Sequence, residues 1–182
     1  YLRNDARYWN GDPVLAEHFR DTWLEVIDPE TDAAYSFLFD VIEGAEAYRN
    51  GNSSDPDSVG IEVISRRVLR VTLAHPATHF LDILAHHSFS PLHPRMRQAE
   101  NWDELPSILG NGPYYIVEQS EDELVLSRNE LYWDHRSVSI PKLRVLFRDS
   151  PAQVTDAFSE GEIDWVSSGI ALDRVQSPQA IS

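Results

Sequence analysis

Hydrophobic residues recur at helical spacing near the start of the chain. Four large apolar side chains stand four positions apart and therefore share one face of an α-helix: Leu15, Phe19, Trp23 and Ile27. Asp12 followed by Pro13 is typical of a helix start, because an Asp side chain caps free backbone N–H groups and proline fits the first turn. The pattern predicts a helix that runs to about residue 26 and buries this apolar stripe.

Apolar and polar positions alternate over residues 59–73, as they do in half-buried strands. This stretch predicts a β-hairpin, although its turn at residues 65–67 lacks the usual Asn-Gly pair. Pro76 ends the second arm. A short helix is predicted over residues 78–85, with three side chains facing inward: Phe80, Leu81 and Leu84.

A second hairpin is predicted over residues 110–133, beginning at the turn sequence Asn111-Gly112-Pro113. Residues 142–147 alternate again and predict a further strand. Ser150 and the proline after it are expected to start a helix whose inner face carries Val154, Ala157 and Phe158. A brief strand is predicted at residues 163–166.

The two halves of the chain differ in organisation. Pro91 and Pro94 indicate an extended crossing, and we place a lobe boundary there, between residues 1–93 and residues 94–182. Helix, hairpin and helix make up the first lobe, and hairpin, strand and helix make up the second. The pattern thus predicts a mixed α+β fold in two small lobes.

The chain has 182 residues, which is long enough to bury a core. Its composition also limits the classes of partner that it can bind. Thirty acidic and 15 basic residues give a formal net charge of −15. Nucleic-acid backbones are recognised by clustered Lys and Arg, so we expect no nucleic-acid partner. The absence of cysteine excludes disulfides and thiolate metal sites and leaves the cellular compartment open.

The sequence carries no recognisable targeting or membrane segment. No apolar run approaches the roughly 18–20 residues of a membrane span. No signal peptide is evident, so three origins stay open: a cytoplasmic chain, a mature chain, or a piece of a longer precursor. The strand-like sequence at Tyr1 favours the last of these.

Seven histidines raise the hypothesis of a metal site. His75 and His79 are four positions apart, but Pro76 lies between them, and no carboxylate stands at a ligand-like spacing beside them. We therefore expect no metal and no cofactor. No serine elbow, P-loop or dinucleotide motif is present, and we expect no catalytic residues.

Two stretches are candidates for contact with a small ligand. Tyr35 lies in the aromatic sequence YSFLF, where it either packs in the core or offers a ligand its ring and one hydroxyl. Ser167 and Ser168 follow a predicted strand end, where they either bind a ligand or form a plain loop. The residue pattern alone favours packing and loop.

The order of short motifs resembles the family 5 extracellular solute-binding proteins, the oligopeptide-, dipeptide- and nickel-binding subunits of ABC importers. The motifs that carry this resemblance are RNDARYWNGDPV at residues 3–14, IEGAEAY at 42–48, the hairpin at 59–73, GNGPY at 110–114, LSRNELYW at 126–133 and GEID at 161–164. Two departures are a Trp9 loop one residue shorter than the common form and two arginines in the hairpin turn.

The resemblance implies a fragment of a type II periplasmic-binding-protein-like fold. Residues 1–93 correspond to the accessory lobe and residues 94–182 to part of the first large ligand-binding lobe, and the second large lobe is absent. It implies a substrate-binding component that holds peptides between two lobes and delivers them to an ABC permease. It also implies a periplasmic or extracellular, membrane-associated location.

Ligand residues follow from the resemblance only where positions match. Tyr35 stands where the oligopeptide binders place a ligand-facing tyrosine, and Ser167 and Ser168 stand where they place two asparagines. Three alternatives stay open: a nickel or other small-solute binder, an intracellular sensor of this fold, and a metal-dependent enzyme.

Truncation has its own expected consequences. Strands whose partners are missing leave open sheet edges, so we expect copies of this chain to dimerise through such edges. We also expect little peptide affinity from the isolated chain, because half of the cleft would be absent.

Overall fold

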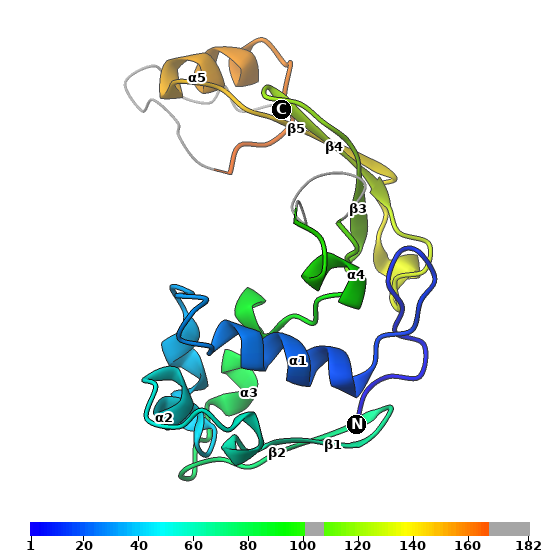
Figure 1. Ribbon diagram of the computed structural model, residues 1–182. Helices are drawn as coiled ribbons and strands as arrows, with labels where there is room; N and C mark the ends of the chain where they lie inside the picture. Colours follow the sequence, from blue (N-terminus) through cyan, green and yellow to red (C-terminus); the bar gives the residue numbers. More distant parts are fainter. Residues whose placement is uncertain (101–107, 168–182) are drawn as a thin grey trace. The chain divides into compact units, whose positions relative to one another are not determined.

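The computed structural model describes residues 1–100 and 108–167, in which helices and strands are mixed, as predicted (Figure 1). The elements are α1 Ala16–Val26, η1 Ser36–Val41, α2 Ala45–Arg49, η2 Pro56–Ser58, β1 Ile61–Ser65, β2 Val68–Val71, α3 Phe80–Ile83, η3 His87–Phe89, α4 Pro94–Arg97, β3 Tyr114–Gln119, β4 Glu123–Arg128, η4 His135–Ser137, β5 Lys142–Leu146 and α5 Pro151–Ser159. Within the described residues, every helix is too short or too polar to cross a lipid bilayer.

The chain forms two compact units. The first comprises Tyr1–Tyr115 with Ser127–Pro141, and the second comprises Ile116–Leu126 with Lys142–Ser182. The predicted boundary after residue 93 concerns how the family's lobes divide. The division into compact units does not test that boundary, which stays a prediction.

The start of α1 differs from the prediction. Residues before the helix form a small antiparallel bridge between Arg7 and Pro13, in which the Tyr8 N–H donates to the Asp12 carbonyl. The helix therefore begins at Ala16, and Asp12 is not its N-cap. This bridge provides hydrogen bonds for backbone groups that the sequence pattern assigned to a helix.

The core of the first unit is aromatic. Trp23 of α1 packs edge-to-face against Phe39 of η1 and Phe89 of η3, with ring centroids 5.9 and 5.2 Å apart. The two phenylalanine rings stack on each other at 4.0 Å. The Trp23 indole N–H also donates to the buried Phe89 carbonyl at 2.9 Å. Three segments far apart in the sequence are thus joined at one point.

The first hairpin lies beside α1 (Figure 1). β1 and β2 pair antiparallel, with Ile61 opposite Val71 and a register irregularity between Val63 and Ser65. This irregularity lies next to the turn whose sequence lacked Asn-Gly. The Arg66 carbonyl in that turn accepts the Ala16 N–H at 2.9 Å, which ties the turn to the start of α1.

The second unit contains helix α5 and residues of a three-stranded sheet, in which the strand order is β3-β4-β5. Val125 of β4 is buried in it. Ser150 caps α5 as predicted, because its hydroxyl accepts the Gln153 N–H and Pro151 occupies the first turn. The strand expected at residues 163–166 is not formed.

Two side chains predicted to face inward are exposed instead. Leu81 of α3 is 77% exposed and Phe158 of α5 is 51% exposed. In α3 the side chains of Phe80, Ile83 and Leu84 pack against the core, and in α5 Thr155 and Ala157 are buried. The other predicted inward side chains include Phe80 and Leu84, which pack against the core, and Ala157, which is buried, so only Leu81 and Phe158 depart from the prediction.

Candidate functional site

Tyr35 lies immediately before η1, at the position that caps this short helix. Its own carbonyl accepts the Leu38 N–H, so the tyrosine is part of the first helical turn. The side chain is 46% exposed, and it is therefore available to a ligand and not buried in the core.

Two histidines from a distant part of the chain flank this tyrosine. The Tyr35 ring packs edge-on against His86 and His87, with centroid distances of 4.7 and 5.6 Å, and the two imidazoles lie 4.1 Å apart. The exposed Phe37 ring is 6.4 Å from Tyr35. We call Tyr35, Phe37, His86 and His87 the aromatic–imidazole cluster.

The backbone of η3 orients His86. Its Nδ1 accepts the Ser88 N–H at 3.3 Å, so in the neutral ring the proton resides on Nε2. Phe89, which follows Ser88 in the chain, is buried against Trp23 in the core. The cluster therefore stands on a packed base and offers rings, one phenol hydroxyl and imidazole N–H groups at the surface, a mixture that suits an amphipathic ligand.

Sequence reasoning did not associate the two histidines with Tyr35. From the sequence, the two histidines were considered only as possible metal ligands. Their contact with Tyr35 was not predicted, because local periodicity cannot connect residues 50 positions apart. The nearest sequence signal was the change of character at residues 86–94, where prolines follow paired histidines.

The predicted ligand residues Tyr35 and Ser167 belong to different compact units, and Tyr35 lies in the first. Ser167 is exposed and belongs to the second unit. Ser168 lies outside the described residues. Their role in ligand contact stays a prediction.

The histidines do not assemble into a metal centre in the part of the chain that the structure describes, where no group of three potential ligand side chains converges. His93 instead makes two hydrogen bonds within the fold. Its Nε2 lies 3.0 Å from the Asp12 carboxylate, and its Nδ1 accepts the Arg95 N–H at 3.1 Å.

A buried polar network surrounds His93. Tyr8 packs edge-on against the His93 ring at 4.8 Å, and its hydroxyl lies 3.1 Å from Nδ1 of His18. Burial raises the pKa of the Tyr8 phenol and lowers the pKa of the His18 imidazole, since both charged forms are poorly solvated there. Hydrogen bonds from Asn10 and then His93 lower the pKa of Asp12. The network joins the segment before α1 to the segment after η3.

The buried His18 predicts acid sensitivity. A histidine whose folded-state pKa is lowered contributes stability fully above its unfolded pKa of about 6.5, and that stability is lost as the pH falls toward the folded pKa. We expect the free energy of unfolding to fall between pH 7.5 and pH 5, and His18→Gln to flatten this slope. Urea unfolding at a series of pH values measures it, with the exposed His75→Gln as the control. An unchanged slope in His18→Gln would contradict the assignment.

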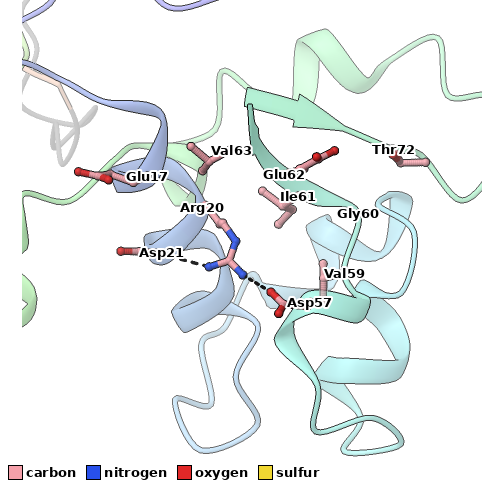
Figure 2. A pocket seen from close by; sticks show the side chains of 10 residues that line it. All are labelled: Glu17, Arg20, Asp21, Asp57, Val59, Gly60, Ile61, Glu62, Val63 and Thr72. Atoms are coloured by element: carbon pink, nitrogen blue, oxygen red, sulfur yellow. Dashed lines mark hydrogen bonds and ion pairs between the residues drawn. The ribbon is translucent and has the colours of Figure 1, made fainter. Parts of the chain in front are cut away.

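A groove of about 590 Å³ opens between α1 and β1 (Figure 2). Arg20 reaches from α1 to the Asp57 carboxylate at 2.6 Å and lies 3.8 Å from Asp21. Glu17 and Glu62 also line the groove. The groove lies entirely in the first unit and contains none of the residues of the aromatic–imidazole cluster.

Comparison with known proteins gives matches along nearly the whole chain. Residues 1–180 match the family model described as bacterial extracellular solute-binding proteins, family 5 Middle. The dipeptide-binding protein DppE of Bacillus subtilis is 30% identical over 166 residues, which cover 90% of this chain and 30% of that protein. The periplasmic oligopeptide-binding protein OppA of Escherichia coli is 30% identical over 182 residues, which cover 97% of this chain and 33% of that protein.

Solved structures match at a similar level. Haemophilus influenzae OppA, in complex with the peptide RPPGFSPFR, is 26% identical with a TM-score of 0.87, covering 93% of this chain and 34% of that one. Burkholderia pseudomallei OppA is 27% identical with a TM-score of 0.85, covering 92% of this chain and 34% of that one. The chain thus spans about a third of the length of the relatives it matches.

Proposed function

Because this chain belongs to the bacterial extracellular solute-binding proteins of family 5, we propose that the protein containing it is the peptide-binding component of an ABC importer. In this proposal the protein holds a peptide in a cleft between two lobes and delivers it to a membrane permease. The single observation that carries the proposal is the family match over residues 1–180.

The sequence resemblance to this family is confirmed, and so is the fold class. The matched structures are type II periplasmic binding proteins, and the chain corresponds to a mixed helix-and-strand part of them. Members of the family are solute-binding proteins. We propose that this protein likewise binds without catalysis.

The names of the relatives support a peptide as the ligand. They include dipeptide-, oligopeptide- and murein peptide-binding proteins. A matched Bacillus anthracis structure is the substrate-binding domain of an oligopeptide ABC transporter, 29% identical with a TM-score of 0.83. By the same reasoning we propose a permease as partner and a periplasmic or extracellular location.

A second candidate function is the binding of a non-peptide solute. The probable deoxycholate-binding periplasmic protein YgiS of Escherichia coli is 26% identical over 173 residues, which cover 91% of this chain. The same part of the fold therefore occurs in a relative with a different ligand class. Nickel and other small solutes belong to this second candidate.

Within the described residues, we assign the aromatic–imidazole cluster as the ligand-facing surface. Tyr35 supplies exposed ring area, and the ring is held in place by His86 and His87. The exposed Ser167 and its neighbour Ser168 are proposed as further contacts. Such a surface suits peptides, whose backbone needs polar partners and whose side chains need apolar area.

The test uses the full-length protein that contains this chain and calorimetric titration with a mixture of tri- to pentapeptides. We expect binding, and we expect Tyr35→Ala to weaken it about tenfold, the effect of removing a well-placed aromatic contact. Leu81→Ala, which removes an exposed apolar side chain outside the cluster, should leave the affinity unchanged.

Two negative results of this titration would lead to different conclusions. No heat with any peptide, together with binding of deoxycholate or Ni²⁺, would replace the peptide proposal by the second candidate. Peptide binding that Tyr35→Ala leaves intact would retain the function and reject the cluster as its contact surface.

A further inference from the structure

Asparagine is followed directly by glycine at three places in the chain: Asn10, Asn50 and Asn111. In such a pair the backbone nitrogen of the glycine can attack the side-chain amide carbon of the asparagine. Glycine favours this reaction because it has no Cβ to hinder the approach or restrict the backbone. Asparagine is accordingly one of the thermolabile residues of proteins. The three pairs differ in which of their reacting groups the fold already engages.

The fold holds both reacting groups of the Asn10-Gly11 pair. The Asn10 side-chain amide donates to the Asp12 carboxylate at 2.7 Å, and its oxygen accepts the Asp12 N–H at 3.0 Å. The attacking group, the Gly11 N–H, donates to the Tyr8 carbonyl at 2.9 Å. A reaction at Asn10 would have to break these hydrogen bonds, so the folded chain protects this pair.

The Asn50-Gly51 pair is protected at its attacking nitrogen. Asn50 is the C-cap of α2, and its side chain is exposed. The Gly51 N–H donates to the Tyr48 carbonyl at 3.0 Å, within the turn that ends the helix. The asparagine amide is therefore open to solvent, but the glycine nitrogen that would attack it is held in a hydrogen bond.

The Asn111-Gly112 pair differs from the other two. Among the described residues, neither the Asn111 side chain nor the Gly112 N–H has a hydrogen-bond partner. Both residues are partly exposed, so water reaches them. The neighbouring carbonyls are anchored: that of Gly110 accepts the Trp9 N–H at 2.9 Å. That of Gly112 accepts the side-chain amide of the buried Asn129 at 2.9 Å. The fold thus fixes both ends of the turn and leaves its reacting groups free to meet.

We propose that Asn111 is a site of spontaneous covalent modification, at which the Gly112 nitrogen closes a succinimide ring. In this reaction the Gly112 nitrogen bonds to Cγ of Asn111, and the bond between Cγ and Nδ2 breaks. Nδ2 leaves as ammonia and takes the amide proton of Gly112 with it. Water then opens the ring at one of its two carbonyl carbons and yields aspartate or isoaspartate.

The products change a turn that the fold holds at both ends. Each product carries a new carboxylate, on a chain whose formal net charge is already −15. Isoaspartate also inserts one extra backbone carbon between the anchored carbonyls of Gly110 and Gly112. The modified turn is then longer than the segment that these two hydrogen bonds span.

The test incubates the folded 182-residue chain in mildly alkaline buffer made with heavy-oxygen water, followed by mass spectrometry of its tryptic peptides. Trypsin places the three pairs on separate peptides, because arginines lie between them. Ring opening during the incubation adds one heavy oxygen, whereas a reaction during digestion in ordinary water adds none. We expect Asn111 to be modified about tenfold faster than Asn10 or Asn50, the factor that one hydrogen bond of typical strength implies.

Unfolding in urea separates the fold from the local sequence. The three pairs lose their different hydrogen bonds in the unfolded chain, and we expect them to react there at similar rates. The proposal is overturned if the three pairs react alike in the folded chain, if none of them reacts, or if Asn111 leads by the same factor in urea.

Gly112→Ala tests the attacking nitrogen directly. A Cβ at this position would meet no atom within 4 Å, so the fold tolerates it, but it hinders the attack on Asn111 and should slow the modification. Gly110→Ala is the matched control, because a Cβ there also meets no atom within 4 Å and lies on the other side of Asn111. An unchanged rate in Gly112→Ala, or equal slowing by the two variants, would refute the ring closure by Gly112.

Discussion

Trp23→Ala is expected to lower the free energy of unfolding by about 3–5 kcal/mol, the usual cost of truncating a buried tryptophan. The side chain is 3% exposed and packs against Phe39 and Phe89. Its loss leaves a cavity between α1, η1 and η3. It also removes the donor of a 2.9 Å hydrogen bond to the Phe89 carbonyl, a buried group that would then be unpaired.

Urea unfolding monitored by far-ultraviolet circular dichroism measures this change. Trp165→Ala is the matched control, because Trp165 is 78% exposed and its removal should alter stability by less than about 0.5 kcal/mol. Trp23→Phe keeps most of the packing and should fall between the two. A loss below about 1 kcal/mol for Trp23→Ala would mean that this aromatic contact is not the centre of the core.

Gly44→Ala is expected to lower the free energy of unfolding by about 2–5 kcal/mol for two separate reasons. Gly44 has a φ of +74°, which residues with a Cβ adopt only at a cost. A Cβ at this position would also lie 2.3 Å from the Ser58 carbonyl oxygen, which is backbone and cannot rotate away. The glycine lets η2 approach the start of α2.

Gly51→Ala separates the two reasons. Gly51 has a similar φ of +71°, but a Cβ there would meet no atom within 4 Å. We expect it to cost only about 1 kcal/mol, the conformational part alone. Equal losses for the two variants, measured by urea unfolding, would show that the close approach to Ser58 contributes nothing.

The consequence of Gly44→Ala should extend to the hairpin. Glu43, its neighbour, donates its N–H to the Thr72 carbonyl and accepts the Gly60 N–H, and so clamps the base of the hairpin. A displaced Gly44 would disturb these two bonds. The backbone conformation that Gly44 requires therefore affects the position of β1, which lines the groove.

Long periodic stretches were predicted well because each carries its signal within a few neighbours. The stripe that contains Trp23 predicted α1, and alternation predicted the strands of both hairpins. Boundaries were predicted less well. Asp12 and Pro13 have the composition of a helix start, but a bridge with Arg7 forms there instead, and the Asp12 carboxylate binds His93.

The sequence identified only part of the candidate site. Tyr35 was named because a family motif places a ligand-facing tyrosine there, and its exposure agrees with such a role without testing it. His86 and His87 were missed as its neighbours, because their contact with Tyr35 depends on how η3 packs on the aromatic core. Neither helical nor strand periodicity encodes that contact.

The sequence by itself determined the secondary structure of the periodic segments, the acidic charge and the family, because each depends on residue order or composition. The tertiary structure decided which half-buried side chains reach the surface, where α1 begins, and that a groove opens between α1 and β1. These features depend on contacts between segments tens of residues apart, and the free energy of such contacts is absent from any local pattern.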